Sequence, residues 1–492
     1  MREDSTPFRT RFAPICRQIV AAAAAVAIGL GSATASGAAG EHPRIAAEWE
    51  PALGALVVWP PVVPDELLVE IAEDDRLFLI VADLEQREEA TARLTELGVD
   101  LESVELIVDP TLDGENWTRD WGPSALFDAN ANYHLLDPTF NGYPMALPDC
   151  EGRLYDLLGL IPFLNEWIPG GSTDLNADSL AEVLGVSTVK LPFGLTGGNA
   201  LVDGLGTAFS TCVMLKENRD WFGLSESEFR QAVAARLGLH RYVVVPNFEW
   251  FGIQHIDCLL KPLDAETLLV KRVPEGHPDH RPTEAIVALL SELKTPYGRP
   301  YRIVRIDAAP YYMGHHVANY TNALILNRKI FVPLFGVDTD ERALATLREA
   351  MPGYEVIGYA YEDVMGWAWY DALHCRVRAV WDPKMLYMAH QQIRGRVKPA
   401  DSHRVDVLIR DYSRAGLIAD ELKLSWRVRG KTNWNEVALT AGATPETYTA
   451  SIPAPAATAI EYFLSAADRS GRRETLPRVA PEGVYSFEVA VH

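Results

Sequence analysis

The chain has 492 residues, of which 48% are hydrophobic and 23% charged, a composition typical of a folded protein with a large core. Its formal net charge is −22, which argues against a nucleic-acid partner and mildly favours a cationic substrate. The length suggests two or three domains.

The first 39 residues have the pattern of a secretory signal. Four arginines precede an apolar run from Ile19 to Leu30, and small residues follow it. The run is too short for a comfortable membrane span, and no later stretch qualifies as one. We therefore expect cleavage after Ala35 or Ala39 and a secreted or periplasmic mature chain.

Hydrophobic periodicity alternates between helix and strand over residues 41–397, which predicts an α/β catalytic domain. The expected elements are a strand at 55–59, a helix at 64–73, strands at 77–82 and 104–108 around a helix at 85–97, strands at 268–270 and 301–306 around a helix at 283–293, and strands at 330–334 and 354–359 around a helix at 339–350. Their recurring order suggests an internal repeat whose loops converge on one site. Sequence similarity between the units is weak.

The composition changes near residue 400. Short strands separated by turn residues are expected at 405–409, 422–429, 436–439, 448–452, 460–467 and 484–491. This pattern predicts a small β-sandwich of immunoglobulin type over residues 402–492, with the domain boundary in 396–402. The cysteine pair of antibody domains is missing, so only the sandwich architecture is implied.

The residues that suggest chemistry centre on Cys375. A lone cysteine is usually a small buried hydrophobe, but this one follows four polar motifs along the chain. They are Trp117–Pro123, Gly197–Asn199, His255–Asp257 and Tyr320–Asn322. Together the five offer a thiol, an imidazole, two carboxylates and an amide, a set that suits covalent attack on a planar, cationic carbon.

A guanidinium group has such a carbon, and its hydrolysis assigns a role to each residue. Carboxylates bind the fork of the cation in bidentate fashion, a task for Asp120 and Asp257. The thiolate of Cys375 is the best nucleophile near neutral pH. The imidazole of His255 can protonate the departing nitrogen and then activate water. Side chains fill every role, so we expect neither a metal nor a cofactor.

The other cysteines raise two further questions. Without Cys375 and the signal, Cys150, Cys212 and Cys258 remain, so at most one disulfide can form, and we expect three packed thiols. His255 and Cys258 could be half of a metal site. On a strand, however, Cys258 would face away from Asp257, which disfavours that interpretation.

Two other classes of cysteine enzyme fit the sequence poorly. A phosphatase loop needs glycine and a closing arginine at places that here hold Arg378 and Trp381. No known local signature of a thiol protease surrounds Cys375. Structural alternatives remain for two motifs: Arg119 and Asp120 could form a surface ion pair, and the Gly-Gly-Asn could be a simple turn.

The motifs together resemble the bacterial peptidylarginine deiminase and agmatine deiminase family of the pentein, guanidine-modifying superfamily. The resemblance runs in family order over roughly residues 43–395. It implies a fivefold pseudosymmetric α/β propeller. By matching position it implies guanidinium-binding aspartates at Asp120 and Asp257, a general acid/base at His255, a nucleophile at Cys375, and substrate-binding residues at Trp117, Asn199 and Asn322.

The branch within this family sets the expected substrate. The Ala372–Cys375 stretch, the signal and the β-sandwich are closer to the peptidylarginine type, so we expect arginine-containing peptides or proteins as substrates. Residues 141–145 lack the arginines that hold a C-terminal carboxylate in secreted relatives. The alternatives are deimination of agmatine, another small guanidine or free arginine, and a pentein-fold binding protein whose chemistry has lapsed.

Overall fold

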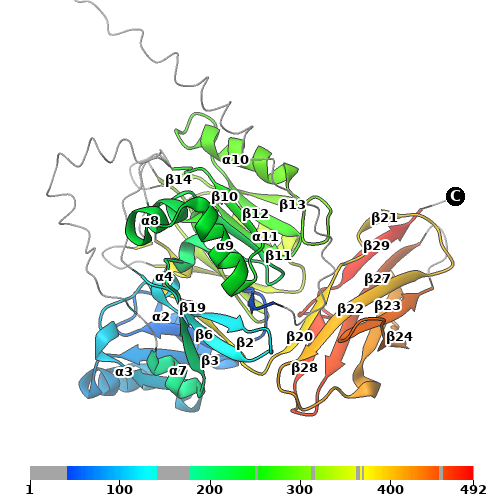
Figure 1. The fold of residues 1–492 in the computed structure, drawn as a ribbon, viewed down its shortest axis with the longest axis horizontal. Helices are drawn as coiled ribbons and strands as arrows, with labels where there is room; N and C mark the ends of the chain where they lie inside the picture. Colours follow the sequence, from blue (N-terminus) through cyan, green and yellow to red (C-terminus); the bar gives the residue numbers. More distant parts are fainter. Residues whose placement is uncertain are drawn as a thin grey trace, which may run out of the picture. The chain divides into compact units, whose positions relative to one another are not determined.

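The computed structural model describes residues 42–140, 175, 178–249, 253–311, 316–361, 366–367, 371–453 and 458–490. The expected signal at residues 1–39 lies outside these ranges. Within them, no helix is long and apolar enough to cross a membrane. The fold is of mixed α/β type (Figure 1).

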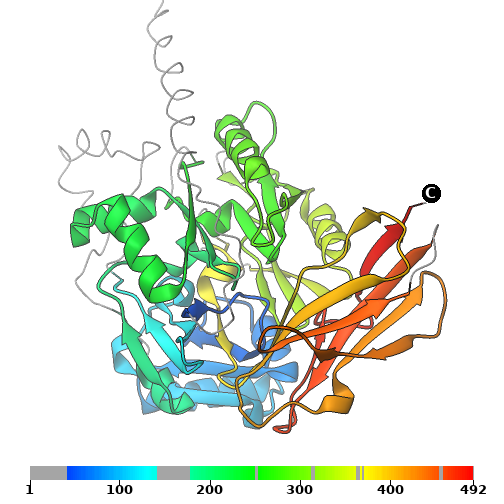
Figure 2. The ribbon, with the colours of Figure 1, turned by 45° about the vertical axis from the view of Figure 1, so that its right-hand side comes forward.

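Five sheets in the first part of the described chain share one strand pattern (Figures 1 and 2). In each, an antiparallel pair is extended by a parallel strand. For example, β16 (Leu324–Leu326) runs antiparallel to β17 (Lys329–Leu334), and β17 is parallel to β18 (Glu355–Ala360). The parallel step needs a crossover connection, which α11 (Asp340–Ala350) supplies here.

The other four sheets repeat this arrangement. They consist of β19 (Arg378–Trp381), β2 (Ala52–Val58), β3 (Arg76–Val81) and β4 (Val104–Val108); of β1 (Arg44–Ile45), β5 (Ser124–Phe127), β6 (Tyr133–Asp137) and β7 (Ser187–Lys190); of β8 (Leu201–Val202), β9 (Thr207–Thr211) and β10 (Arg241–Val245); and of β11 (Leu260–Asp264), β12 (Thr267–Arg272) and β13 (Arg302–Asp307). A short extra pair joins β14 (Pro310–Tyr311) to β15 (His316–Val317).

Helices connect and cover these sheets. The longer ones are α2 (Asp65–Asp74), α3 (Leu84–Glu96), α7 (Asp178–Leu184), α8 (Val213–Phe222), α9 (Glu226–Leu237) and α10 (His280–Glu292). Helix α9, which the periodicity missed, begins at a capping box between Ser225 and Glu228 and ends at Gly238, whose φ of 68° suits glycine. The elements that the sequence did predict before residue 360 are present, with ends displaced by at most three residues.

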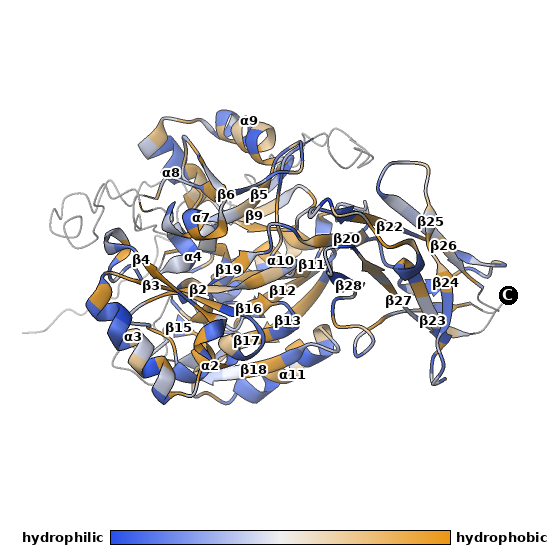
Figure 3. Ribbon diagram, turned by 90° about the horizontal axis from the view of Figure 1, so that it is seen from below, coloured by the Kyte–Doolittle hydropathy of each residue, from blue (hydrophilic) through white to orange (hydrophobic). Residues whose placement is uncertain are grey.

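Burial follows the hydropathy of each element. In β3 every residue after Arg76 is buried, as expected for a strand covered on both faces. Helix α3 buries only Ala90 and Leu94 and exposes a polar face to solvent. Figure 3 shows this contrast between the hydrophobic strands and the hydrophilic outer helices.

The C-terminal strands form two sheets around a separate core (Figure 1). The predicted strands are found as β22 (His403–Asp411), β23 (Lys423–Val428), β24 (Asn435–Ala438), β26 (Thr447–Ile452), β27 (Ala459–Ala467) and β29 (Tyr485–Val489), with β25 (Thr440–Ala441) and β28 (Arg473–Leu476) in addition. Tyr462 and Leu464 from β27 and Ile409 from β22 are buried together in this core.

Two strands extend these sheets upstream of the expected boundary. β20 (Leu386–His390) pairs antiparallel with β22, and β21 (Gly395–Val397) pairs in parallel with β29. The connecting segment therefore supplies strands to both C-terminal sheets, which begin before residue 396 rather than after it. Pairing satisfies backbone groups that a free edge would expose.

Candidate active site

Four of the expected site residues come from three separate segments of the chain and are all buried. Asp120 lies in α4 (Thr118–Trp121), and His255 and Asp257 lie at the short 3-10 helix η4 (Ile256–Cys258). Cys375 lies in α12 (Leu373–Arg376). Each of the four side chains is at most 1% exposed, so the tertiary fold brings separate segments into one interior site.

Gly198 marks the point where three of these groups meet. Its backbone N–H donates to Oδ1 of Asp120 at 3.0 Å. A β-carbon at this position would lie 2.6 Å from that oxygen, 2.8 Å from Nδ1 of His255 and 3.2 Å from Oδ2 of Asp257. Such contacts leave no room for a side chain, so the Gly-Gly-Asn is more than a simple turn.

Asn322 holds the nucleophile and its helix. Its Nδ2 lies 3.2 Å from Sγ of Cys375, and its Oδ1 accepts hydrogen bonds from the backbone N–H groups of His374 at 3.0 Å and Cys375 at 3.4 Å. Arg119 adds bonds from its guanidinium to the carbonyl oxygens of His374 and Val377. The thiol is therefore fixed in position by one amide and one guanidinium.

The local charges set the protonation of the reactive pair. Burial, together with Asp257, Asp371 and other carboxylates, raises the pKa of Cys375 well above its ordinary value. Burial alone would lower the pKa of His255, but Asp120, 3.4 Å from its Nδ1, and Asp257 outweigh it and raise that pKa. Without substrate the site therefore favours a neutral thiol and a protonated imidazole.

The two carboxylate oxygens of Asp257 differ in their contacts. Oδ2 lies 2.8 Å from Nδ1 of His374 and 4.0 Å from Sγ of Cys375. Oδ1 is buried and has no hydrogen-bond partner in the part of the chain that the structure describes. Because a buried carboxylate oxygen without a partner is costly, it is poised to accept bonds from a cation placed beside the thiol.

Glu48, which the sequence did not single out, contacts both His374 and Arg119. Its Oε2 lies 2.5 Å from Nε2 of His374 and 3.3 Å from Nη2 of Arg119. Its Oε1 accepts from Lys261 at 2.7 Å and from the backbone N–H of Ile325 at 2.9 Å. His374 thus lies between two carboxylates, and Arg119 pairs with Glu48 within the protein rather than forming a surface pair with Asp120.

Asn199 and Trp117 lie at different depths. Oδ1 of Asn199 accepts from the backbone N–H groups of Thr211 at 2.9 Å and Ile256 at 3.2 Å, so this amide supports η4. Its buried Nδ2 has no hydrogen-bond partner within the described ranges. Trp117 is 40% exposed and hydrogen-bonds Asp371, next to the nucleophile helix. Trp117 is therefore the accessible member of the predicted set.

Two expectations about cysteines need correction. Cys258 lies in a 3-10 helix and not on a strand, so alternation does not turn it away from the site, and its Sγ is 4.0 Å from Nδ2 of Asn322. Cys212 is disulfide-bonded rather than a packed thiol. Cys258 and Cys375 are free thiols.

The comparisons with known proteins agree with this fold. A solved agmatine deiminase of Enterococcus faecalis matches this chain with a TM-score of 0.53 and 18% identity. The match spans 71% of this chain and 99% of that protein. A solved C. jejuni agmatine deiminase variant with substrate bound matches with a TM-score of 0.53 and 17% identity. This match spans 69% of this chain and 96% of that protein. A Streptococcus mutans protein named "Putative agmatine deiminase" is 25% identical over 325 residues, which are 61% of this chain and 82% of the relative.

These likenesses show the fold, and the family match to residues 44–378 adds the activity: the class of protein is a pentein-fold deiminase that acts on guanidino groups. The sequence profile of the Porphyromonas-type peptidyl-arginine deiminases matches residues 44–378. The chain belongs to that family.

Proposed function

We propose that this protein is a secreted deiminase that hydrolyses the guanidinium group of arginine residues in peptides or proteins to citrulline and ammonia. The observation that carries the proposal is the carboxylate of Asp257: its Oδ2 lies 4.0 Å from Sγ of Cys375 and close to the same glycine as Asp120 and His255, while its buried Oδ1 has no hydrogen-bond partner among the described residues. Two carboxylates, a thiol and a protonated imidazole around one point match the needs of a guanidinium carbon.

Binding of the cation prepares the nucleophile. Asp120 and Asp257 accept N–H bonds from the two edges of the guanidinium. The same positive charge lies beside Sγ of Cys375, where it offsets the carboxylates that raise the thiol pKa. The substrate therefore promotes loss of the thiol proton to solvent, where it later protonates the released ammonia, and the thiolate forms a C–S bond with the central carbon.

Proton transfers at His255 complete the reaction. The imidazolium gives its proton to one nitrogen, the C–N bond breaks, and ammonia leaves a covalent thiouronium on Cys375. The neutral imidazole then takes a proton from water as its oxygen attacks the same carbon. The C–S bond breaks, releasing the ureido product and restoring the cysteine. In sum, one guanidinium and one water give one urea group and one ammonium.

Preference for peptidyl arginine rests on the chain beyond the site. The expected signal and the C-terminal sheets, which we propose to be an immunoglobulin-like sandwich, suit a secreted enzyme that meets proteins. Trp117, 40% exposed beside the nucleophile helix, offers an apolar surface to a substrate larger than a free amino acid. The five sheets with one shared strand pattern support the fivefold propeller that we propose for residues 41–397.

Agmatine is the second candidate substrate, because relatives 25% identical to this chain are named "Putative agmatine deiminase". Agmatine has no carboxylate and therefore needs no cationic clamp. Residues 141–145, and Arg153 near them, lie outside the described ranges. Arg302 and Arg305, two other candidates for a clamp, are bonded elsewhere: Arg302 to the carbonyl of Ala350, and Arg305 to Glu284.

A colorimetric assay for the ureido group tests the proposal. Equal concentrations of agmatine, free arginine, and matched peptides with internal, C-terminal and amidated C-terminal arginine should be compared with the purified mature chain. We expect peptides with internal or amidated arginine to react at least as well as the free-acid peptide, and better than agmatine. Faster turnover of agmatine would assign the second function, and no product from any guanidine would indicate a binding protein with lapsed chemistry.

A further inference from the structure

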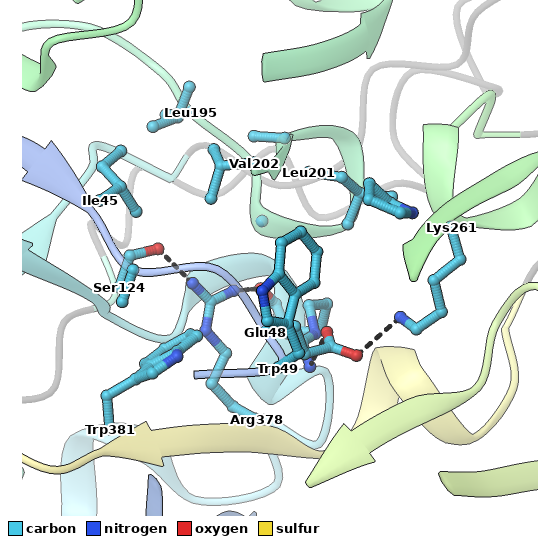
Figure 4. A pocket seen from close by; sticks show the side chains of 15 residues that line it. Ile45, Glu48, Trp49, Ser124, Leu195, Leu201, Val202, Lys261, Arg378 and Trp381 are labelled. Carbon is cyan, nitrogen blue, oxygen red and sulfur yellow. Dashed lines mark hydrogen bonds and ion pairs between the residues drawn. The ribbon is translucent and has the colours of Figure 1, made fainter. Parts of the chain in front are cut away.

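A cavity that shares no wall with the reactive groups lies next to the supports of the nucleophile helix (Figure 4). Its lining contains none of the four residues assigned to chemistry. About 40 Å³ of it is open to the centres of water-sized molecules, which is enough for roughly three waters or one small ion. Figure 4 shows a polar floor with Arg378, Glu48 and Lys261, and apolar side chains on the opposite wall, among them Leu195 and Val202.

The floor carries more positive than negative charge. Arg119, Lys261 and Arg378 line it together with a single carboxylate, that of Glu48. The three cationic residues are at most 4% exposed. Glu48 already accepts from His374, Lys261, Arg119 and a backbone N–H, so its oxygens are fully used.

Among the described residues that line the floor, Arg378 is the cation outside any ion pair; the carboxylates of Glu48 and Asp120 act on it only from beyond ion-pair distance. Among the described residues it has no carboxylate within ion-pair distance; its guanidinium donates only to neutral oxygens, the carbonyls of Arg119 at 2.6 Å and Pro123 at 3.2 Å, and the hydroxyl of Ser124. These bonds use three of its five N–H groups. Burial, reinforced by Arg119, lowers the pKa of Arg378 to about 9. Charged side chains are almost never fully buried unless they are paired.

We propose that a small monovalent anion, chloride or a short carboxylate such as acetate, binds in this cavity against the guanidinium of Arg378. The ion would supply the missing counter-charge, and the apolar wall suits weakly hydrated ions better than water. Because Arg119 and Glu48 border the cavity and also contact His374, a bound anion stabilises the support of the nucleophile helix. The proposal requires no catalytic step and can be tested on inactive protein.

Thermal unfolding in different sodium salts at constant ionic strength tests the proposal. Replacing gluconate, which is too large for the cavity, by chloride or acetate should raise the Tm saturably, by roughly 2 °C at ten times the dissociation constant. The response should disappear in Arg378→Met. It should persist in Arg410→Met, the matched control, because Arg410 is also buried but pairs with Glu446 in the C-terminal sheets.

Bromide soaked into crystals of the wild-type protein provides a second readout that does not depend on the folding of any variant. An anomalous peak within hydrogen-bond distance of Arg378 supports the proposal. Saturating bromide with no peak in the cavity, or peaks only at surface residues, would overturn it and leave water as the occupant. Equal Tm values in chloride, acetate and gluconate would also overturn it. A rise in acetate but not chloride would identify the ligand as a carboxylate.

Discussion

Glu48 offers the sharpest test of how the site is supported. In Glu48→Gln the side chain keeps its shape but loses its charge, so Lys261 at 2.7 Å and Arg119 at 3.3 Å lose their carboxylate partner. The side chains of these cations are 2% and 4% exposed, so solvent cannot replace the lost charge. Breaking a buried pair from one side costs about 3–5 kcal/mol. We expect the Tm to fall by roughly 4–7 °C, because the entropy of unfolding grows with the size of the domain.

The pH dependence of the stability lost in Glu48→Gln tests the direction of the pKa shift of Glu48. Burial alone would raise the pKa of Glu48, but His374, Lys261 and Arg119 hold it well below its ordinary value. A carboxyl whose pKa is depressed on folding stabilises the protein above its unfolded pKa of about 4.3, and this contribution is lost as the pH falls through the folded pKa. The difference between wild type and Glu48→Gln should therefore be complete at pH 7 and shrink only below about pH 4.

Calorimetric melting of the two proteins from pH 7 downward measures both quantities. Glu70→Gln is the matched control, because Glu70 also pairs with a buried lysine, Lys329, but Asp74 remains as that lysine's second partner at 2.7 Å. It should cost about 1 kcal/mol or less. A Tm for Glu48→Gln within 2 °C of wild type, or no larger a loss than in the control, would refute the role assigned to Glu48.

Three further predictions concern the reaction. Asp257→Asn should lower kcat/KM at least about tenfold to a hundredfold, the equivalent of about 1.5–3 kcal/mol. The Tm should change little, because an asparagine oxygen can still accept from His374 and because Oδ1 has no partner among the described residues; a large loss of Tm with normal kcat/KM would mark the aspartate as structural. Asp120→Asn should move the alkaline limb of the kcat/KM profile to lower pH, because Asp120 helps to raise the pKa of His255, whose proton the leaving nitrogen needs; an unmoved limb would contradict that role. Cys375→Ala should be folded but inactive. In the wild type, cationic 2-chloroacetamidine should alkylate Cys375 much faster than neutral 2-chloroacetamide does, because only the cation offsets the carboxylates that raise the thiol pKa. Equal alkylation rates, measured by mass spectrometry, would argue against activation of the thiol by substrate charge.

Local sequence patterns predicted some helices and strands of the fold and missed others. The elements between residues 55 and 108 were predictable because apolar residues recur with the period of each element, and the same holds for the C-terminal strands. Helix α9 was missed although Ser225 and Glu228 form a capping box, because its apolar residues make no clear stripe. The strands β20 and β21 were missed because their partners lie elsewhere in the chain.

The candidate site divides in the same way. Asp120, His255, Asp257 and Cys375 could be chosen from the sequence because reactive residue types recur in short motifs. The structure buries all four and places the first three around Gly198. The roles given to them come from chemistry and from family resemblance. That they meet is a property of the fold alone, since the segments are separated by more than a hundred residues.

Glu48 and Arg378 show what only the tertiary structure decides. Neither lies in a recognisable pattern of reactive residues: Glu48 sits between Ala47 and Trp49 in the N-terminal segment, and Arg378 resembles one of many strand residues. Their importance comes from burial and from partners far along the chain, His374 and Lys261 for the first and Ser124 for the second. The sequence by itself determined those helices and strands that have a clear hydrophobic period, and the chemical groups available. The pairing of buried charges depends on distances of a few ångströms between remote segments, which only the folded chain defines.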